Sequence, residues 1–162
     1  MAANRFVVIF VSQRNTLRSM LAQACLSHIG GDRFAAYSCG QPGRVGDRIH
    51  PAALSALSTA RMAAPLQPPR GWGELTRGDS PRANFVITLD ADTFTSQPRW
   101  PGQPDAALWA FPDIADEQNP EAAALQMLYA LRRRLELMTS LPLQVADREA
   151  IRSDVRDLAN MQ

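Results

Sequence analysis

The chain lacks several features that mark whole classes of proteins. Its 17 basic residues include no lysine, and a formal net charge of +1 gives no broad basic field for nucleic acid or for an anionic membrane. Two cysteines, Cys25 and Cys39, are too few for a disulfide-stabilised scaffold. No apolar run reaches the about 18 residues of a membrane-spanning helix. The N-terminal run Phe6–Val11 is too short for the core of a signal peptide. We therefore expect a cytoplasmic protein with neither a nucleic-acid nor a membrane partner.

The remaining sequence predicts one folded domain. With 162 residues, of which 46% are hydrophobic, the chain is long enough to bury a core, so we assign 1–162 to a single domain. Runs rich in β-branched and aromatic residues predict buried strands. The predicted strands are 6–11, 34–39, 85–89 and 107–111. Apolar residues at helical spacing, with Gly or Pro at the ends, predict the helices. The predicted helices are 17–30, 51–59, 120–139 and one in a C-terminal tail of about 141–162, with Asp147 near its start. Residues 63–84, rich in Pro and Gly, read as an irregular excursion. Alternating strands and helices predict an α/β three-layer sandwich around a parallel four-stranded sheet.

The segment from Ser12 to Ser19 joins the first predicted strand to the first predicted helix. Backbone N–H groups converge where such a loop enters a helix, and the helix dipole favours negative charge there. Arg18 can add a bidentate fork for a tetrahedral oxyanion. Asn15 and Ser19 can hold the loop together by hydrogen bonds. The alternative is an ordinary strand-to-helix connection with a solvated arginine.

This segment resembles the phosphate-binding loop of the low-molecular-weight tyrosine phosphatases and the related arsenate reductases. That loop reads Val-Cys-x-Gly-Asn-x-Cys-Arg-Ser, and Asn15, Arg18 and Ser19 match it. The similarity extends over roughly residues 6–160. It is also carried by His28–Phe34, Tyr37–Gly40, Phe85–Leu89, Trp100–Pro104, Trp109–Asp113 and the segment from Leu135 through Leu143.

The resemblance assigns a role to each matching position. Ser12 stands at the position of the nucleophile, Arg18 inherits oxyanion binding, and Asp113 matches the general acid. The rest of the anion-binding loop is Gln13, Arg14, Asn15, Thr16, Leu17 and Ser19. The implied ligand is phosphate, sulfate or an arsenate-like oxyanion, and no metal or other cofactor is implied.

Serine at position 12 departs from the family at its most important residue. The family's nucleophile is a thiolate, whereas a hydroxyl is a far weaker acid that needs a neighbouring base. The only histidines are His28, at the far end of the first predicted helix, and His50, in a loop. Neither supports a catalytic dyad with Ser12.

Four other departures concern the loop, the thiol relay and the residue after Asp113. Arg14 replaces a glycine, and a glycine in a tight loop permits positive φ. We therefore expect Arg14 either to distort the loop or to fill the anion site. Leu17 replaces the loop's second cysteine, and Asp90 stands where the reductases place another, so the relay that regenerates a reductase is missing. Ile114, where the family usually has proline, follows Asp113.

The other candidate groups have simpler interpretations. We predict that Cys25 belongs to the core and keep a reactive thiol at Cys39 as a hypothesis. The acidic cluster matches no metal loop, and we interpret it as a solvated rim. It comprises Asp90, Asp92, Asp113, Asp116 and Glu117.

Three functions remain open from the sequence. The first is a catalytically impaired family member that binds an oxyanion or a protein partner. The second is an active phosphatase or arsenate reductase whose cysteine at position 12 was changed to serine by engineering. The third is a structural homodimer subunit with a closed pocket. An anion held by Arg18 favours the first, and a pocket filled by Arg14 favours the third.

Overall fold

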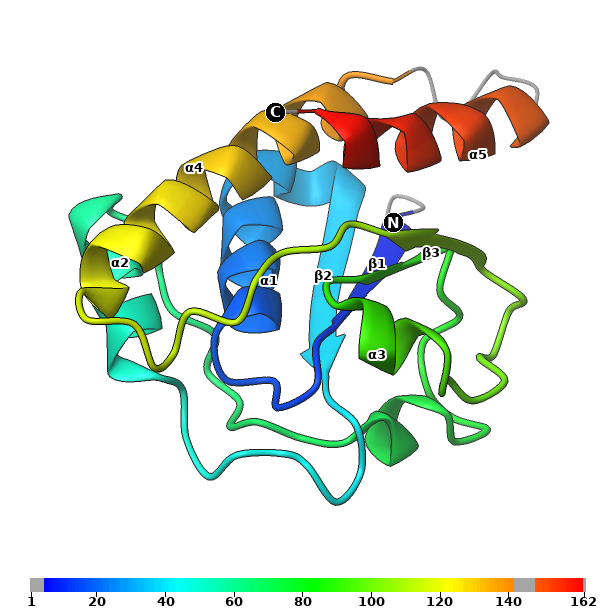
Figure 1. The fold of residues 1–162 in the computed structure, drawn as a ribbon. Helices are drawn as coiled ribbons and strands as arrows, with labels where there is room; N and C mark the ends of the chain where they lie inside the picture. The colour runs from blue at the N-terminus through cyan, green and yellow to red at the C-terminus, as the bar shows by residue number, and fades with distance from the viewer. Residues whose placement is uncertain (1–4, 142–147, 162) are drawn as a thin grey trace.

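Four strands form one parallel sheet in the order β2-β1-β3-β4 (Figure 1). The computed structural model describes residues 5–141 and 148–161. The strands are β1 (Phe6–Val11), β2 (Phe34–Cys39), β3 (Phe85–Thr88) and β4 (Asp105–Leu108). The predicted α/β class and the four-stranded parallel sheet are confirmed. The fourth strand begins two residues before the prediction, because Asp105 pairs with Phe85 at the start of the ladder. Trp109 still donates its backbone N–H to Thr88 just beyond β4.

Five α-helices are present in the described residues. They are α1 (Arg18–Gly30), α2 (Pro51–Thr59), α3 (Ala91–Phe94), α4 (Pro120–Thr139) and α5 (Arg148–Asp157). The predicted bounds of α2 and α4 are confirmed, and each of these helices begins with a proline, which needs no backbone hydrogen bond in the first turn. The helix predicted in the C-terminal tail is α5, and the expected start near Asp147 lies outside the described residues.

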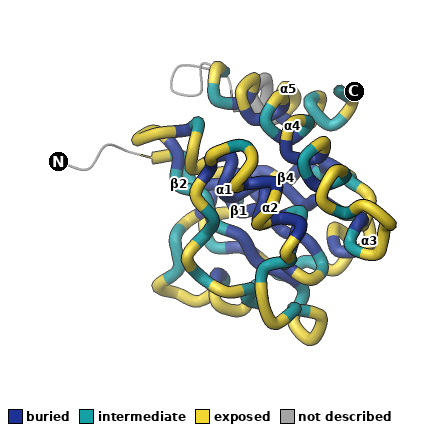
Figure 2. The backbone as a smooth tube through the Cα atoms, turned by 90° about the vertical axis from the view of Figure 1, so that its left-hand side faces the viewer, coloured by how far each residue is buried: buried dark blue, intermediate teal, exposed yellow. Residues whose placement is uncertain are grey.

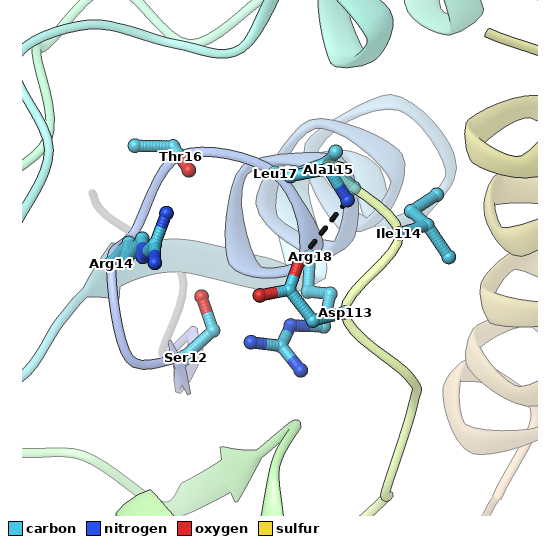
Figure 3. Close-up of a pocket in the computed structure, with 8 residues that line it drawn as sticks. All are labelled: Ser12, Arg14, Thr16, Leu17, Arg18, Asp113, Ile114 and Ala115. Atoms are coloured by element: carbon cyan, nitrogen blue, oxygen red, sulfur yellow. Dashed lines mark hydrogen bonds between the residues drawn. The ribbon is translucent and has the colours of Figure 1, made fainter. Parts of the chain in front are cut away.

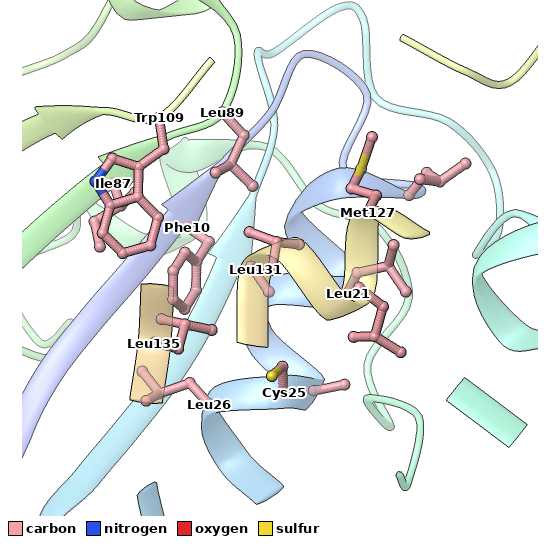
Figure 4. Close-up of a cluster of buried hydrophobic side chains, with 14 of the residues drawn as sticks. Phe10, Leu21, Cys25, Leu26, Ile87, Leu89, Trp109, Met127, Leu131 and Leu135 are labelled. Carbon is pink, nitrogen blue, oxygen red and sulfur yellow. The ribbon is translucent and has the colours of Figure 1, made fainter. Parts of the chain in front are cut away.

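The sheet is buried on both faces, as the unbroken apolar run in β1 predicts. Val8 and Phe10 face a core formed with α1, α2, α4 and Val155 of α5. Figure 4 shows side chains of α1 and α4 meeting those of the strands in this core. Ile9 and Val11 face a smaller cluster on the opposite side. Figure 2 shows buried residues along the strands and the helices beside them, with exposed residues along the loops.

The layer over the second face is built largely from loops. Its apolar contacts come from a 3₁₀ turn, Trp72–Leu75, and from Ala83 and Trp100. The irregular excursion predicted for 63–84 is thus confirmed except for that short turn. No helix in the described part of the chain is long and apolar enough to cross a membrane.

The apolar stripe of α4 should carry much of the folding free energy. Leu131 is fully buried in the main core, whereas Leu137 in the same helix is 45% exposed. We expect Leu131→Ala to lower the free energy of unfolding by about 2–5 kcal/mol, because the removed atoms leave a cavity. The control Leu137→Ala should change it by about 1 kcal/mol or less. Urea denaturation followed by circular dichroism measures both. Equal effects would contradict this packing of α4.

Candidate functional site

Hydrogen bonds from a neighbouring segment to its backbone carbonyls hold the loop after β1. The carbonyls of Gln13, Arg14 and Thr16 accept hydrogen bonds from backbone N–H groups of the loop that precedes α2. These donors are Gln41 at 2.9 Å, Gly46 at 3.0 Å and His50 at 2.9 Å. Gly40 allows this close packing, since a Cβ there would lie 2.9 Å from the Gln13 carbonyl oxygen. The carbonyl side of the loop is therefore fixed.

The N–H side of the same loop is almost unused. Gln13 donates its N–H to the Asp90 carboxylate at 3.0 Å. The N–H groups of residues 14–20 have no acceptor within 5–141 and 148–161. The first turn of α1 has no side-chain cap and no acidic residue, so its positive dipole end is uncompensated by its own sequence. This leaves a row of backbone donors at a helix N-terminus.

Asn15, rather than Arg14, adopts the left-handed conformation in the loop. The φ of Asn15 is +56°, and Arg14 is not among the residues with positive φ. Asparagine tolerates this region better than most residues do, because its short polar side chain bonds to nearby backbone groups. The prediction that Arg14 distorts the loop by occupying a glycine conformation is therefore wrong.

Buried side chains connect the two ends of the loop. The Ser12 hydroxyl donates to the Ser19 hydroxyl at 2.6 Å, and the Asn15 side-chain amide donates to the same oxygen at 2.7 Å. The side-chain oxygen of Asn15, Oδ1, accepts a hydrogen bond from the backbone N–H of Arg70 at 3.0 Å. The side chains of Ser12, Asn15 and Ser19 are all buried. The network therefore fixes the loop, and the Ser12 hydroxyl in it bonds to another hydroxyl rather than to a base.

A small cavity collects the residues that the sequence assigned to the site. Ser12, Arg14, Arg18 and Asp113 line it together with residues 16–17 and 114–115 (Figure 3). The volume is about 20 Å³, room for about one water molecule. Arg14 lies on the rim with an exposed side chain. The loop after β4 brings Asp113 to the cavity, where its carboxylate accepts from the Ala115 N–H at 3.1 Å.

The Arg18 guanidinium is bound to the protein itself. One terminal nitrogen donates to the Phe111 carbonyl oxygen at 3.0 Å, and the other lies 3.8 Å from an Asp90 carboxylate oxygen. The Asp90 side chain is only 13% exposed, so interpreting it as part of a solvated rim is wrong. The available signal was its place directly after β3, because the carboxyl ends of adjacent parallel strands meet at one edge of a sheet.

The remaining candidates supply neither a base nor a metal site. His50 accepts the Ala52 N–H with its Nδ1 at 3.0 Å, so it caps α2. His28 lies in the last turn of α1, at the opposite end from Ser12. Among residues 5–141 and 148–161, no group of three His, Cys, Asp or Glu side chains is arranged to hold a metal ion.

The structure has a parallel four-stranded sheet with this loop between β1 and α1. Residues 7–118 match the sequence profile of the family described as low molecular weight phosphotyrosine protein phosphatase. This match covers more than half of the 162 residues, and the chain belongs to that family. No curated protein sequence matches the chain significantly.

Solved structures share the fold at low sequence identity. An arsenate reductase from Archaeoglobus fulgidus is 20% identical, with a TM-score of 0.66 over 83% of this chain and 99% of that one. A low molecular weight protein tyrosine phosphatase from Streptococcus pyogenes is 18% identical, with a TM-score of 0.66 over 90% and 97%. Vibrio vulnificus Wzb, in complex with benzylphosphonate, is 10% identical, with a TM-score of 0.68 over 84% and 98%.

Both cysteines lie in buried positions where they cannot act as nucleophiles. Both are fully buried, and burial raises the pKa of each thiol to about 12. Cys25 lies in the main core, as predicted, and the hypothesis of a reactive thiol at Cys39 is wrong.

We expect both thiols to resist a disulfide reagent in the native protein. The raised pKa keeps each thiol protonated at pH 8, and reaction requires the thiolate. Titration with an aromatic disulfide should find no reactive thiol in buffer and both in denaturant. Each buried thiol also contributes to the free energy of unfolding through its raised folded-state pKa. This contribution is fully present below about pH 9 and is lost as pH rises toward 12. Rapid labelling of the folded protein at pH 8 would contradict this account.

Proposed function

We propose that this chain is a catalytically impaired, cytoplasmic member of its family that binds a phosphate-like oxyanion in the loop from Ser12 to Ser19. The observation that carries the proposal is the row of backbone N–H groups from residue 14 to residue 20, for which the described residues provide no acceptor. Backbone donors at a helix N-terminus bind phosphate and sulfate well. The buried Ser12–Ser19–Asn15 network supports the loop without occupying these donors.

Arg18 and Arg14 supply positive charge to such a ligand. One N–H of Arg18 bonds to the Phe111 carbonyl, and the other four N–H donors of the guanidinium can supply a bidentate contact. The exposed Arg14 can turn outward and enlarge the 20 Å³ cavity. Benzylphosphonate bound to the structurally similar Wzb supports an oxyanion as the ligand class.

The chemistry of Ser12 argues against turnover. Its side chain is buried, and its hydroxyl is bonded to another hydroxyl rather than to a base. A serine needs a nearby general base to become a nucleophile, and both histidines are placed elsewhere. Leu17 and Asp90 cannot relay electrons as cysteines can, so arsenate reduction with thiol turnover is also unsupported.

The small volume of the cavity favours a second candidate, a structural subunit with a closed pocket that acts through protein contacts or as a homodimer. A cavity of about 20 Å³ is too small for a four-oxygen anion unless side chains move. The two functions differ in their response to phosphate, which stabilises the folded state only if the loop binds it.

Phosphate should raise the melting temperature of the protein through Arg18. At a phosphate concentration about ten times the Kd, the stabilisation is about 1.4 kcal/mol, or about 3–6 °C for a chain of this size. Arg18→Ala should abolish the shift, and Arg44→Ala, on the exposed loop before α2, should retain it. Differential scanning fluorimetry at constant ionic strength measures all three. An unchanged wild-type melting temperature in tens of millimolar phosphate would favour the closed structural subunit.

Restoring the thiol tests whether Ser12 is the main catalytic lesion. We expect Ser12→Cys to gain hydrolysis of an aryl phosphate, because a thiol at a helix N-terminus ionises readily and Asp113 already lines the cavity. Since Arg14 carries no positive-φ strain, this gain should not require Arg14→Gly, and a double-mutant cycle on the rate measures the coupling between these two residues of one cavity. An inactive single variant and an active double variant would instead show that Arg14 disables the loop.

The wild-type protein should not reduce arsenate catalytically. With serine, leucine and aspartate at positions 12, 17 and 90, the chain has no thiol pair at the loop to oxidise and regenerate. A coupled thioredoxin assay should show no arsenate-dependent consumption of reductant. Turnover above the rate without protein would overturn the assignment of an impaired enzyme.

A further inference from the structure

Asp90 places a carboxylate against the donors of the candidate oxyanion site. One of its oxygens, Oδ2, accepts the Gln13 N–H at 3.0 Å and lies 3.8 Å from a terminal nitrogen of Arg18. The first donor belongs to the loop itself, and the second belongs to Arg18, the first residue of α1. The Asp90 side chain is 13% exposed, so water screens this charge poorly.

The other oxygen of Asp90 has a separate structural role. Oδ1 accepts the Thr93 N–H at 2.8 Å and caps α3. The carboxylate is therefore anchored by α3 on one side and offers its second oxygen to the loop on the other. This anchoring holds the carboxylate beside the loop.

We infer that Asp90 is an affinity-determining residue that competes, as an internal anion, with the oxyanion for Gln13 N–H and Arg18. The inference rests on the proposed oxyanion binding and adds the group that limits its affinity. An incoming phosphate has to displace Oδ2 from these donors or bind next to a like charge, and both weaken binding. The site therefore binds oxyanions weakly, although its backbone donors are in place.

Removing this charge without removing the helix cap tests the inference. Asp90→Asn and Asp90→Ser both retain a good N-cap oxygen for Thr93. Asp92→Asn is the matched control, because it removes the same charge from an exposed position in the first turn of α3. Isothermal titration with inorganic phosphate, at fixed pH and ionic strength, gives the Kd of each protein.

We expect Asp90→Asn and Asp90→Ser to bind phosphate at least about tenfold more tightly than the wild type, since removing a like charge a few ångströms away contributes that much at a partly buried site. Asp92→Asn should stay within about twofold of the wild type. Tighter binding by the Asp90 variants when the wild type binds undetectably also supports the inference.

Two results would overturn it, and they are distinguishable. Equal Kd values for the wild type and both Asp90 variants would refute the competition and leave the proposed oxyanion binding intact. No binding by any of the proteins would refute both. If neither Asp90 variant folds, carboxyl ¹³C resonances of the wild type decide: phosphate should shift the resonance of Asp90 and leave that of Asp92 in place, and an unshifted Asp90 would overturn the inference.

Discussion

The site depends on the one-sided hydrogen bonding of the loop between β1 and α1. Its carbonyls bond outward to the segment before α2, while its N–H groups from residue 14 onward have no acceptor in the described part of the chain. Unpaired backbone donors are costly when buried, so a loop that keeps them is arranged for an external acceptor or for solvent. Asn15 at a φ of +56° and the buried serines at both ends hold this arrangement.

The same network accommodates serine as the first residue of the loop. The first loop residue takes part in the supporting network through a hydroxyl that bonds to Ser19. Serine is close in size to cysteine and fits the same buried position. In the proposed function, serine at this position lacks the readily ionised group of a cysteine. Asp90 lies beside both ends of the loop, where it accepts the Gln13 N–H and lies 3.8 Å from Arg18.

The sequence predicts most of the fold, because its signals are local. The apolar run of β1 and the proline at the start of α4 fix elements within a few residues of themselves. The N–H donors of the loop are predicted in the same way, because a loop that leads from a strand into a helix ends in such groups. Two features were not predictable in this way. The Arg14 carbonyl accepts a hydrogen bond from Gly46, a residue distant in sequence, and the role of Asp90 depends on the pairing of β3 with β1.

The most direct test of the account is an amide NMR titration of the wild-type protein with inorganic phosphate. If the unpaired N–H groups form the binding site, the amide resonances of residues 14–20 should shift together and saturate with one Kd. Amides on the exposed face of α4 should stay in place. Saturating shifts elsewhere with none in residues 14–20, or no shifts at all, would contradict the claim that this loop binds an oxyanion.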